Sequence, residues 1–149
     1  MTNGYLLFLL AGRLLGVRLD GAIEILPWRP SRSVPLAYSY VEGLIDYRGR
    51  VYPVFNIGQQ LLLTKQAPDG FTPEDVARKQ ASQSIILLEV NKNPLGIVVD
   101  SVVRMTKLED PSTGQPKAQG VDAKFIRGLA YEGEQEIMIL DSERLLHAG

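Results

Sequence analysis

Residues 41–57 read VEGLIDYRGRVYPVFNI, which is two short apolar runs separated by Arg48-Gly49. The runs are rich in Val, Ile and Tyr, and Gly49 stands where a turn needs permissive backbone dihedral angles. Pro53 indicates an edge strand or a bulge, because proline donates no hydrogen bond to a strand ladder. We therefore predict two adjacent β-strands, near Gly43–Arg48 and Val51–Phe55.

Apolar runs of the same kind recur along the whole chain, broken by Gly, Pro, Asn and Asp, and helical periodicity is scarce. This spacing is typical of an all-β fold with short helices. We expect the other strands near Tyr5–Ala11, Leu14–Leu19, Ala22–Trp28, Ser84–Val90, Leu95–Val99, Val102–Leu108, Gly128–Tyr131 and Glu136–Leu140. Short helices are expected at Leu36–Val41, Gly58–Leu63 and Ser142–His147.

Glycine, asparagine and proline mark the connections between these elements. Gly12-Arg13 and Asn91-Lys92-Asn93-Pro94 are predicted hairpin turns, because glycine and asparagine tolerate positive φ. Two polar stretches that contain proline and glycine, Thr64–Gln83 and Glu109–Gly120, are predicted to be exposed loops.

The motifs occur twice in the same order. Leu15–Asp20 (LGVRLD) is matched by Leu95–Asp100 (LGIVVD), an offset of 80 residues from Gly16 to Gly96. Further matches follow at an offset of 85 residues: Gly43-Leu44 with Gly128-Leu129, and Val54-Phe55-Asn56 with Ile139-Leu140-Asp141. A repeated unit of this size implies two similar lobes.

We expect one domain over residues 1–149, built from two five-stranded lobes. Lobe 1 is predicted to cover about residues 12–63 and lobe 2 about residues 84–147, with the loop 64–83 between them and the N-terminal strand as an element that the lobes could share. A barrel of about 65 residues has a small core, so the two lobes should pack together. The groove between them is a favoured place for binding.

The composition excludes several classes of function. Lys and Arg total 16 and Asp and Glu total 17, so the chain has no excess of positive charge for nucleic acid or anionic membranes. The chain has no Cys and one His, His147, which excludes thiolate sites and multi-His metal sites. No P-loop, GxSxG or HExxH motif occurs. We therefore expect no enzymatic activity, no cofactor and no metal.

The sequence also predicts a cytoplasmic protein. The densest apolar stretch, Tyr5–Ala11, is far shorter than the roughly 20 residues that a membrane-spanning helix needs. The N-terminal residues lack the basic region of a secretory signal peptide.

Residues 41–57 resemble the central motif of the CheW family, in which a glycine and an apolar strand precede Asn-Leu-Arg-Gly, an apolar strand with proline, and Asp-Leu. The chain has the family residue at four of these positions: Gly43, Arg48, Gly49 and Pro53. It departs from the motif at Asp46-Tyr47, in place of Asn-Leu, and at Asn56, in place of Asp.

The second half of the chain is also similar to this family. The hairpin around Gly96 and the ending from Gly128 to Leu146 resemble the family's later strands and its last helix. The resemblance therefore runs from about Tyr5 to His147.

The resemblance implies a fold of two SH3-like five-stranded β-barrels. It implies a non-catalytic adaptor that couples a CheA-type histidine kinase to chemoreceptors. The expected partners are the regulatory domain of the kinase and the cytoplasmic hairpin tip of a chemoreceptor. A scaffold of the same kind in a pathway other than chemotaxis is an alternative.

Five residues are candidates for contact with the kinase or the receptor. Glu24 matches the family position whose carboxylate pairs with the arginine at Arg48, and the resemblance places both beside the receptor groove. The alternative for Arg48 is a solvated side chain with no role. Trp28 is either a partner anchor, as tryptophan is favoured at interface hot spots, or core filling. The apolar strand residues Val99 and Val102 complete the set.

Other residues are expected to be structural. Gly43, Gly49, Pro53, Gly96 and Gly128 are predicted to shape the backbone. Asp20 and Asp100, which are equivalent in the repeat, follow apolar strands and are predicted to cap turns.

Two rival functions remain open from the sequence. A small-molecule-binding β-barrel would need a buried pocket with converging polar groups. A minor enzyme that uses Asp20, Asp100 or Glu24 would need a carboxylate with a strongly raised pKa in a cleft.

Overall fold

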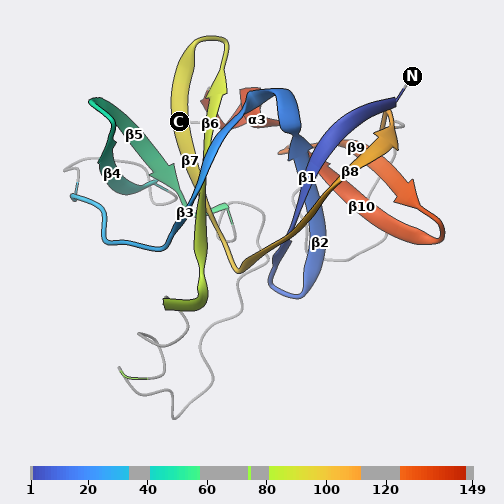
Figure 1. Cartoon of the computed structure of the whole chain (residues 1–149), viewed down its shortest axis with the longest axis horizontal. Coiled ribbons are helices and arrows are strands. Elements are labelled where there is room, and N and C mark those ends of the chain that lie inside the picture. The colour runs from blue at the N-terminus through green and yellow to red at the C-terminus, as the bar shows by residue number, and fades with distance from the viewer. Residues whose placement is uncertain (1, 34–40, 58–73, 75–80, 112–124, 147–149) are drawn as a thin grey trace.

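The computed structural model of the chain describes residues 2–33, 41–57, 74, 81–111 and 125–146. The described strands form two five-stranded sheets that lie side by side (Figure 1). Sheet A has the strand order β8-β1-β2-β10-β9, and sheet B has the order β3-β6-β7-β5-β4. The predicted all-β fold with two lobes is confirmed.

The elements follow one another as β1 (Thr2–Leu10), β2 (Arg13–Arg18), the 3₁₀ turn η1 (Leu19–Gly21), β3 (Ala22–Pro27), β4 (Val41–Tyr47), β5 (Arg50–Phe55), β6 (Ser84–Val90), β7 (Asn93–Val99), β8 (Ser101–Glu109), β9 (Ile126–Glu132), β10 (Gln135–Leu140) and α3 (Ser142–Leu146). Every predicted strand is present, with ends that differ by a few residues. The predicted C-terminal helix is present as α3.

The hairpin turns need left-handed backbone conformations. The β1–β2 turn uses Ala11 and Gly12, with φ of 51° and 77°, one residue earlier than the predicted Gly12-Arg13. The β6–β7 turn uses Asn91 and Lys92, with φ of 51° and 67°, within the predicted segment. A left-handed residue is required here because a two-residue turn must match the right-handed twist of its strands.

Some predicted segments lie outside the described residues. These are the helix at Gly58–Leu63, the helix at Leu36–Val41 except for Val41 itself, which begins β4, and most of the loops Thr64–Gln83 and Glu109–Gly120.

The two sheets do not correspond to the two halves of the sequence. Sheet B is built from β3 to β7, the continuous stretch from Ala22 to Val99. Sheet A combines β1 and β2 with β8, β9 and β10, so it joins the two ends of the chain. The lobe boundaries predicted at 12–63 and 84–147 therefore do not match the sheets, and β1 belongs to sheet A.

The internal repeat accounts for this arrangement. Strands β1–β5 correspond in order to β6–β10, and each sheet joins the first hairpin of one half to the last three strands of the other. The junction is a parallel contact in both sheets, with Gly16 beside Ile139 and Gly96 beside Val54. A Cβ on Gly96 would lie 3.3 Å from side-chain atoms of Ile85 and Leu87. Gly96 therefore has a structural role, because the absence of a side chain there leaves room for these two residues.

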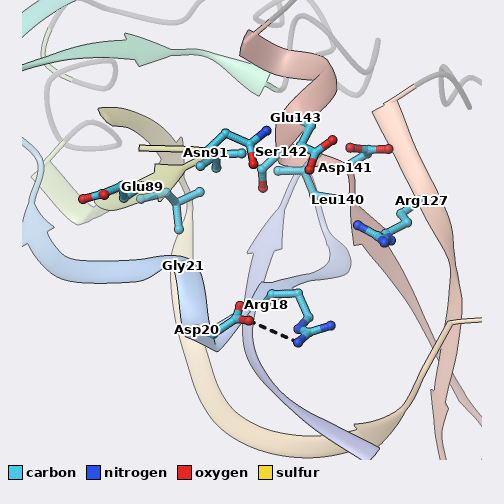
Figure 2. A pocket seen from close by; sticks show the side chains of 12 residues that line it. Arg18, Asp20, Gly21, Glu89, Asn91, Arg127, Leu140, Asp141, Ser142 and Glu143 are labelled. Carbon is cyan, nitrogen blue, oxygen red and sulfur yellow. Dashed lines mark hydrogen bonds and ion pairs between the residues drawn. The ribbon is translucent and has the colours of Figure 1, made fainter. Parts of the chain in front are cut away.

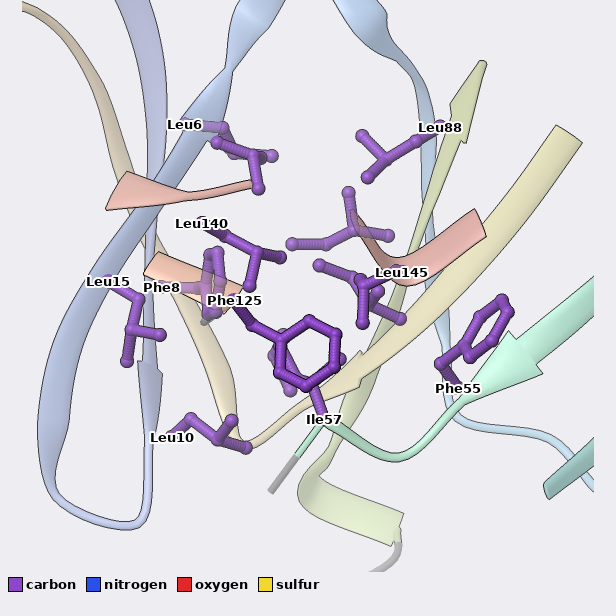
Figure 3. Packing of buried hydrophobic residues seen from close by; sticks show 14 of the residues in the cluster. Leu6, Phe8, Leu10, Leu15, Phe55, Ile57, Leu88, Phe125, Leu140 and Leu145 are labelled. Carbon is purple, nitrogen blue, oxygen red and sulfur yellow. The ribbon is translucent and has the colours of Figure 1, made fainter. Parts of the chain in front are cut away.

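The apolar runs are continuous because their strands are buried on both faces. In β1, Leu6 and Phe8 face the other sheet, whereas Tyr5 and Leu7 face the interior of sheet A. Strands of this kind lose the alternation of apolar and polar residues that a one-sided strand shows. The central core between the sheets (Figure 3) is formed by Leu6, Phe8, Leu10, Leu15, Val17, Phe55, Ile57, Ile86, Leu88, Leu95, Ile97, Val99, Phe125, Leu129, Met138, Leu140 and Leu145.

Gly43 lies where the chain crosses itself closely. Arg32 and Leu44 exchange two backbone hydrogen bonds, of 2.8 and 2.9 Å, directly beside it. A Cβ on Gly43 would lie 2.2 Å from the carbonyl oxygen of Arg32. Only glycine fits, which agrees with the structural role predicted for this residue.

The other motif residues also have backbone roles. Gly49 has a φ of 79° in the β4–β5 turn. Pro53 lies in β5, an interior strand of sheet B. Because β5 pairs with β7 only at Val54 and Phe55, Pro53 lies just before the part of β5 that pairs with β7. Gly128 is buried and pairs with Ile139, next to a bulge in the β9–β10 ladder.

Asp100 lies between β7 and β8 and links this connection to the turn of the β1–β2 hairpin. Its Oδ2 accepts a hydrogen bond of 2.8 Å from the Ala11 amide, and its Oδ1 accepts one of 3.2 Å from Gln83 Nε2. The sequence predicted that Asp100 caps its own local turn. In the structure Asp100 instead caps the β1–β2 turn, which is distant in the sequence. Asp20, its counterpart in the repeat, instead accepts from Arg18 Nη2 at 3.1 Å.

We expect Asp100→Ala to lower the free energy of unfolding by about 2 kcal/mol, because hydrogen bonds to a charged acceptor contribute about 1.5–3 kcal/mol. Asp20→Ala should cost about 1 kcal/mol or less, because its ion pair with Arg18 is exposed. Urea unfolding followed by Trp28 fluorescence measures both values. Equal losses for the two variants would contradict the capping role of Asp100.

Candidate functional site

The edges of sheet B, β3 and β4, meet through a side-chain contact. Glu24 on β3 is half-buried, and its Oε2 accepts a hydrogen bond of 3.3 Å from the phenol of Tyr47 on β4. Its Oε1 accepts from the Ile25 amide at 3.2 Å. We call Glu24, Tyr47 and Arg48 the β3–β4 seam.

Arg48 lies at the turn end of the seam. Its φ of 49° turns the chain out of β4, and its guanidinium carbon lies 5.3 Å from the centre of the Tyr47 ring. This is the geometry of a cation–π contact. Within the described ranges, no ion pair of 4 Å or less joins Arg48 to Glu24.

The direct pairing of Glu24 with Arg48 predicted from the resemblance is therefore wrong in this chain. Tyr47 stands between the two, donating to the carboxylate through its hydroxyl and lying beneath the guanidinium with its ring. The signal was visible in the sequence, because Tyr47 departs from the leucine of the motif. A tyrosine can bind a carboxylate and a cation at the same time, which leucine cannot do.

Further arginines surround the seam. Arg29 donates to the backbone carbonyl of Asp46, and Arg32 pairs with the Asp46 carboxylate at 3.1 Å. Arg50 pairs with Glu89 at 2.9 Å and lies over the ring of Tyr52. Arg48 and Arg50 therefore lie on the β4–β5 hairpin against tyrosine rings, and Arg29 and Arg32, which follow β3, bind Asp46 of the same hairpin.

The other candidate contact residues lie elsewhere. Trp28 is half-buried and packs against the interior of sheet B, and its Nε1 has no hydrogen-bond partner in the described part of the chain. Val99 is fully buried in the central core, so it packs and offers no surface to a partner. Val102 is partly buried against the same core. The seam brings together only Glu24 and Arg48 of the five candidates.

Sheet A has a second seam that the sequence did not reveal. Glu132 on β9 forms an ion pair with Arg104 and accepts a hydrogen bond of 3.0 Å from Thr106, both on β8. In the repeat, Arg104 corresponds to Glu24 and Glu132 to Tyr47. Both sheets are thus closed at equivalent positions, but by different chemistry.

The comparisons with known proteins identify the family. The sequence pattern described as the CheW-like domain matches residues 4–149. The chain belongs to the CheW-like domain family.

Relatives of this CheW-like chain cover most of its length. Chemotaxis protein CheW of Treponema pallidum (strain Nichols) is 25% identical, over 93% of this chain and 78% of that protein. Chemotaxis protein CheW of Rhizobium meliloti (strain 1021) is 28% identical, over 95% of this chain and 89% of that protein. The crystal structure of the scaffolding protein TtCheW from Thermoanaerobacter tengcongensis has a TM-score of 0.76 at 22% identity, over 94% of this chain and 89% of that one, so the folds agree.

The departures from the CheW motif have structural partners. Asp46 forms the ion pair with Arg32 described above, and Asn56 Nδ2 donates a hydrogen bond of 3.4 Å to Glu42 Oε1. Burial raises the pKa of Glu42, and the hydrogen bond from Asn56 opposes that rise. An aspartate in place of Asn56 would bring a second carboxylate up to Glu42 and could donate no hydrogen bond to it. The Asn56 amide of this CheW-like chain donates that hydrogen bond.

Within the described residues of this CheW-like chain, no helix is long and apolar enough to cross a membrane. The same part of the chain contains no group of three His, Cys, Asp or Glu side chains placed to hold a metal ion.

Proposed function

We propose that the chain is a non-catalytic adaptor of the cytoplasm that couples a CheA-type histidine kinase to chemoreceptors. The observation that carries the proposal is the CheW-like family match over residues 4–149. The relatives named chemotaxis protein CheW support it over most of their own lengths.

The finer proposal concerns the contacts. The regulatory domain of the kinase and the hairpin tip of a receptor would bind at the same time, and activity would pass through a change in their relative geometry with no covalent step. Arg48 is exposed at the end of the β3–β4 seam, and Ile23 and Val51 are exposed apolar side chains on β3 and β5. Arginine is enriched at protein interfaces, and exposed apolar side chains supply the apolar area that interfaces bury.

The rival of a small-molecule-binding barrel has less support. The interior of sheet A is filled by Tyr5, Leu7, Leu108, Ala130, Ile137 and Ile139, and that of sheet B by Ile45, Tyr52, Val54, Ile85, Leu87 and Val98. Close-packed apolar interiors leave no room for a ligand.

We expect Arg48→Glu to weaken binding of a receptor-tip fragment by at least tenfold, because a reversed charge at an interface can cost several kcal/mol. Folding should change by less than about 1 kcal/mol, because the side chain is exposed. Calorimetry with the receptor fragment and with the kinase regulatory domain measures the binding.

Lys92→Glu is the matched control, because Lys92 is also an exposed cation at positive φ in a hairpin turn. It should leave binding unchanged. Tyr47→Phe keeps the ring beneath Arg48 and removes the hydrogen bond to Glu24, so it should weaken receptor binding less than Arg48→Glu does. Receptor binding that is unaffected by Arg48→Glu would remove the seam from the proposal, and a failure of both partners to bind the unmodified chain would refute the adaptor function.

A further inference from the structure

The side chain of Tyr47 is held at both of its ends. Its ring packs T-shaped against the ring of Tyr52, with 6.5 Å between the ring centres and 75° between the ring planes. Tyr52 is itself buried in the interior of sheet B. The Tyr47 hydroxyl donates the hydrogen bond of 3.3 Å to Glu24 on β3. The Tyr47 ring is therefore fixed at the edge of the sheet.

Arg48 is exposed and lies over this fixed ring. The turn at Arg48-Gly49, with φ of 49° and 79°, sets the direction in which the Arg48 side chain leaves the backbone. Its guanidinium carbon lies 5.3 Å from the centre of the Tyr47 ring, and Arg48 forms no ion pair with any residue that the structure describes. A contact with the face of a ring leaves the five N–H donors of a guanidinium unused.

The carboxylates on the two edge strands bind other groups. Glu24 accepts hydrogen bonds from the Tyr47 hydroxyl and from the Ile25 amide. Asp46, the residue before Tyr47, pairs with Arg32 at 3.1 Å. Neither carboxylate holds Arg48.

The carboxylate of Glu89, near the end of β6, also has a partner of its own. It pairs at 2.9 Å with Arg50, the other arginine at the β4–β5 turn. Figure 2 shows Glu89 on one side of a pocket between the sheets, with Arg18 and Arg127 on the other side. Within the described residues, Arg48 is therefore held by an aromatic ring and not by a carboxylate.

The second seam, in sheet A, shows the same positions without the tyrosine. Glu132 stands in the place of Tyr47 and pairs with Arg104, which stands in the place of Glu24. Gly133, which lies 85 residues after Arg48, leaves no side chain at the turn. In sheet A the anion and the cation neutralise each other within the chain. In the β3–β4 seam a neutral phenol binds the carboxylate, which leaves the cation unpaired.

We propose that Tyr47 is the positioning residue of the β3–β4 seam. Its ring orients the Arg48 guanidinium toward the partner, and Glu24 serves only as the acceptor that anchors the Tyr47 hydroxyl. This role rests on the proposed function, in which Arg48 meets the receptor tip. A tyrosine that positions Arg48 needs an oxygen acceptor at position 24, whereas an ion pair with Arg48 needs a negative charge there.

Calorimetry of the full chain with a receptor-tip fragment distinguishes these two requirements. Tyr47→Leu removes the ring, so Arg48 must be ordered when the partner binds, and ordering one side chain costs about two- to tenfold in affinity. We expect a loss of about fivefold. Glu24→Gln keeps an oxygen acceptor and removes the charge, so receptor binding should change by less than twofold.

A second background shows whether the effect passes through Arg48. In Arg48→Gln, the further change Tyr47→Leu should weaken binding by less than twofold, because glutamine has no charge for the ring to hold. A merely structural role of Tyr47 would give the same fivefold loss in both backgrounds. The thermal midpoint of each variant checks its folding.

NMR of the free chain detects the contact without a partner. The aromatic ring should shift the side-chain protons of Arg48 upfield in the parent chain, in Glu24→Gln and in Tyr47→Phe, which keeps the ring. Tyr47→Leu should lose this shift.

Three results would each overturn the proposal. They are a loss of receptor binding in Glu24→Gln as large as in Tyr47→Leu, an equal cost of Tyr47→Leu with and without Arg48, and Arg48 protons with no upfield shift in the parent chain. A parent chain that binds no receptor fragment refutes the adaptor function and this role with it, whereas the three results refute the role alone.

Discussion

Phe8→Ala is expected to lower the free energy of unfolding by about 4 kcal/mol, within the range of about 3–5 kcal/mol typical of buried phenylalanine. Phe8 is fully buried in the central core, between strands of both sheets. The loss combines the transfer of the ring to water with a cavity that the two packed sheets cannot close. Urea unfolding with Trp28 fluorescence measures the change.

Leu9→Ala is the matched control for this variant. Leu9 is the next residue of the same strand, but 37% of it is exposed. We expect a loss of about 1 kcal/mol or less, because exposed apolar side chains contribute little. Similar losses for Phe8→Ala and Leu9→Ala would show that the space between the sheets is not the main core.

Gly43→Ala is expected to cost about 3 kcal/mol. The new methyl group would lie 2.2 Å from the Arg32 carbonyl oxygen and 2.7 Å from Ser31 Oγ. Relief requires the backbone to move, which breaks the paired hydrogen bonds between Arg32 and Leu44, each contributing about 0.5–1.5 kcal/mol. Chemical unfolding again gives the value.

Gly12→Ala separates this clash from the cost of a left-handed conformation. Gly12 has a φ of 77°, and an added Cβ would meet no atom within 4 Å. Its expected cost is about 1–2 kcal/mol, the cost of placing a side chain in the left-handed region. A Gly43→Ala variant no less stable than Gly12→Ala would refute the steric account of the motif glycine.

The strands of this protein could be predicted because each is a short apolar run ended by turn residues. The pairing of the strands between the halves could not. The repeat makes the hairpin of Gly16 and the hairpin of Gly96 nearly interchangeable, so the local pattern fits either partner equally well. The choice depends on contacts between residues far apart in the sequence, such as Gly16 with Ile139.

The candidate site was predictable in its residues and not in its contacts. Glu24 and Arg48 could be proposed because their positions match the family motif. The direction of the Arg48 side chain depends on the positive φ at that residue, which no apolar pattern encodes.

The joining of both chain ends in sheet A sets the order in which the protein can be completed on the ribosome. Sheet B ends at Val99, so all of its strands have been synthesised before β8 begins. The hairpin of β1 and β2 is made before sheet B, yet its partner strands β8 and β10 are made after sheet B. An isolated two-stranded hairpin is marginally stable in water. The β1–β2 hairpin, with its apolar run from Tyr5 to Leu10, is therefore made before sheet B and yet completes its own sheet after sheet B can form.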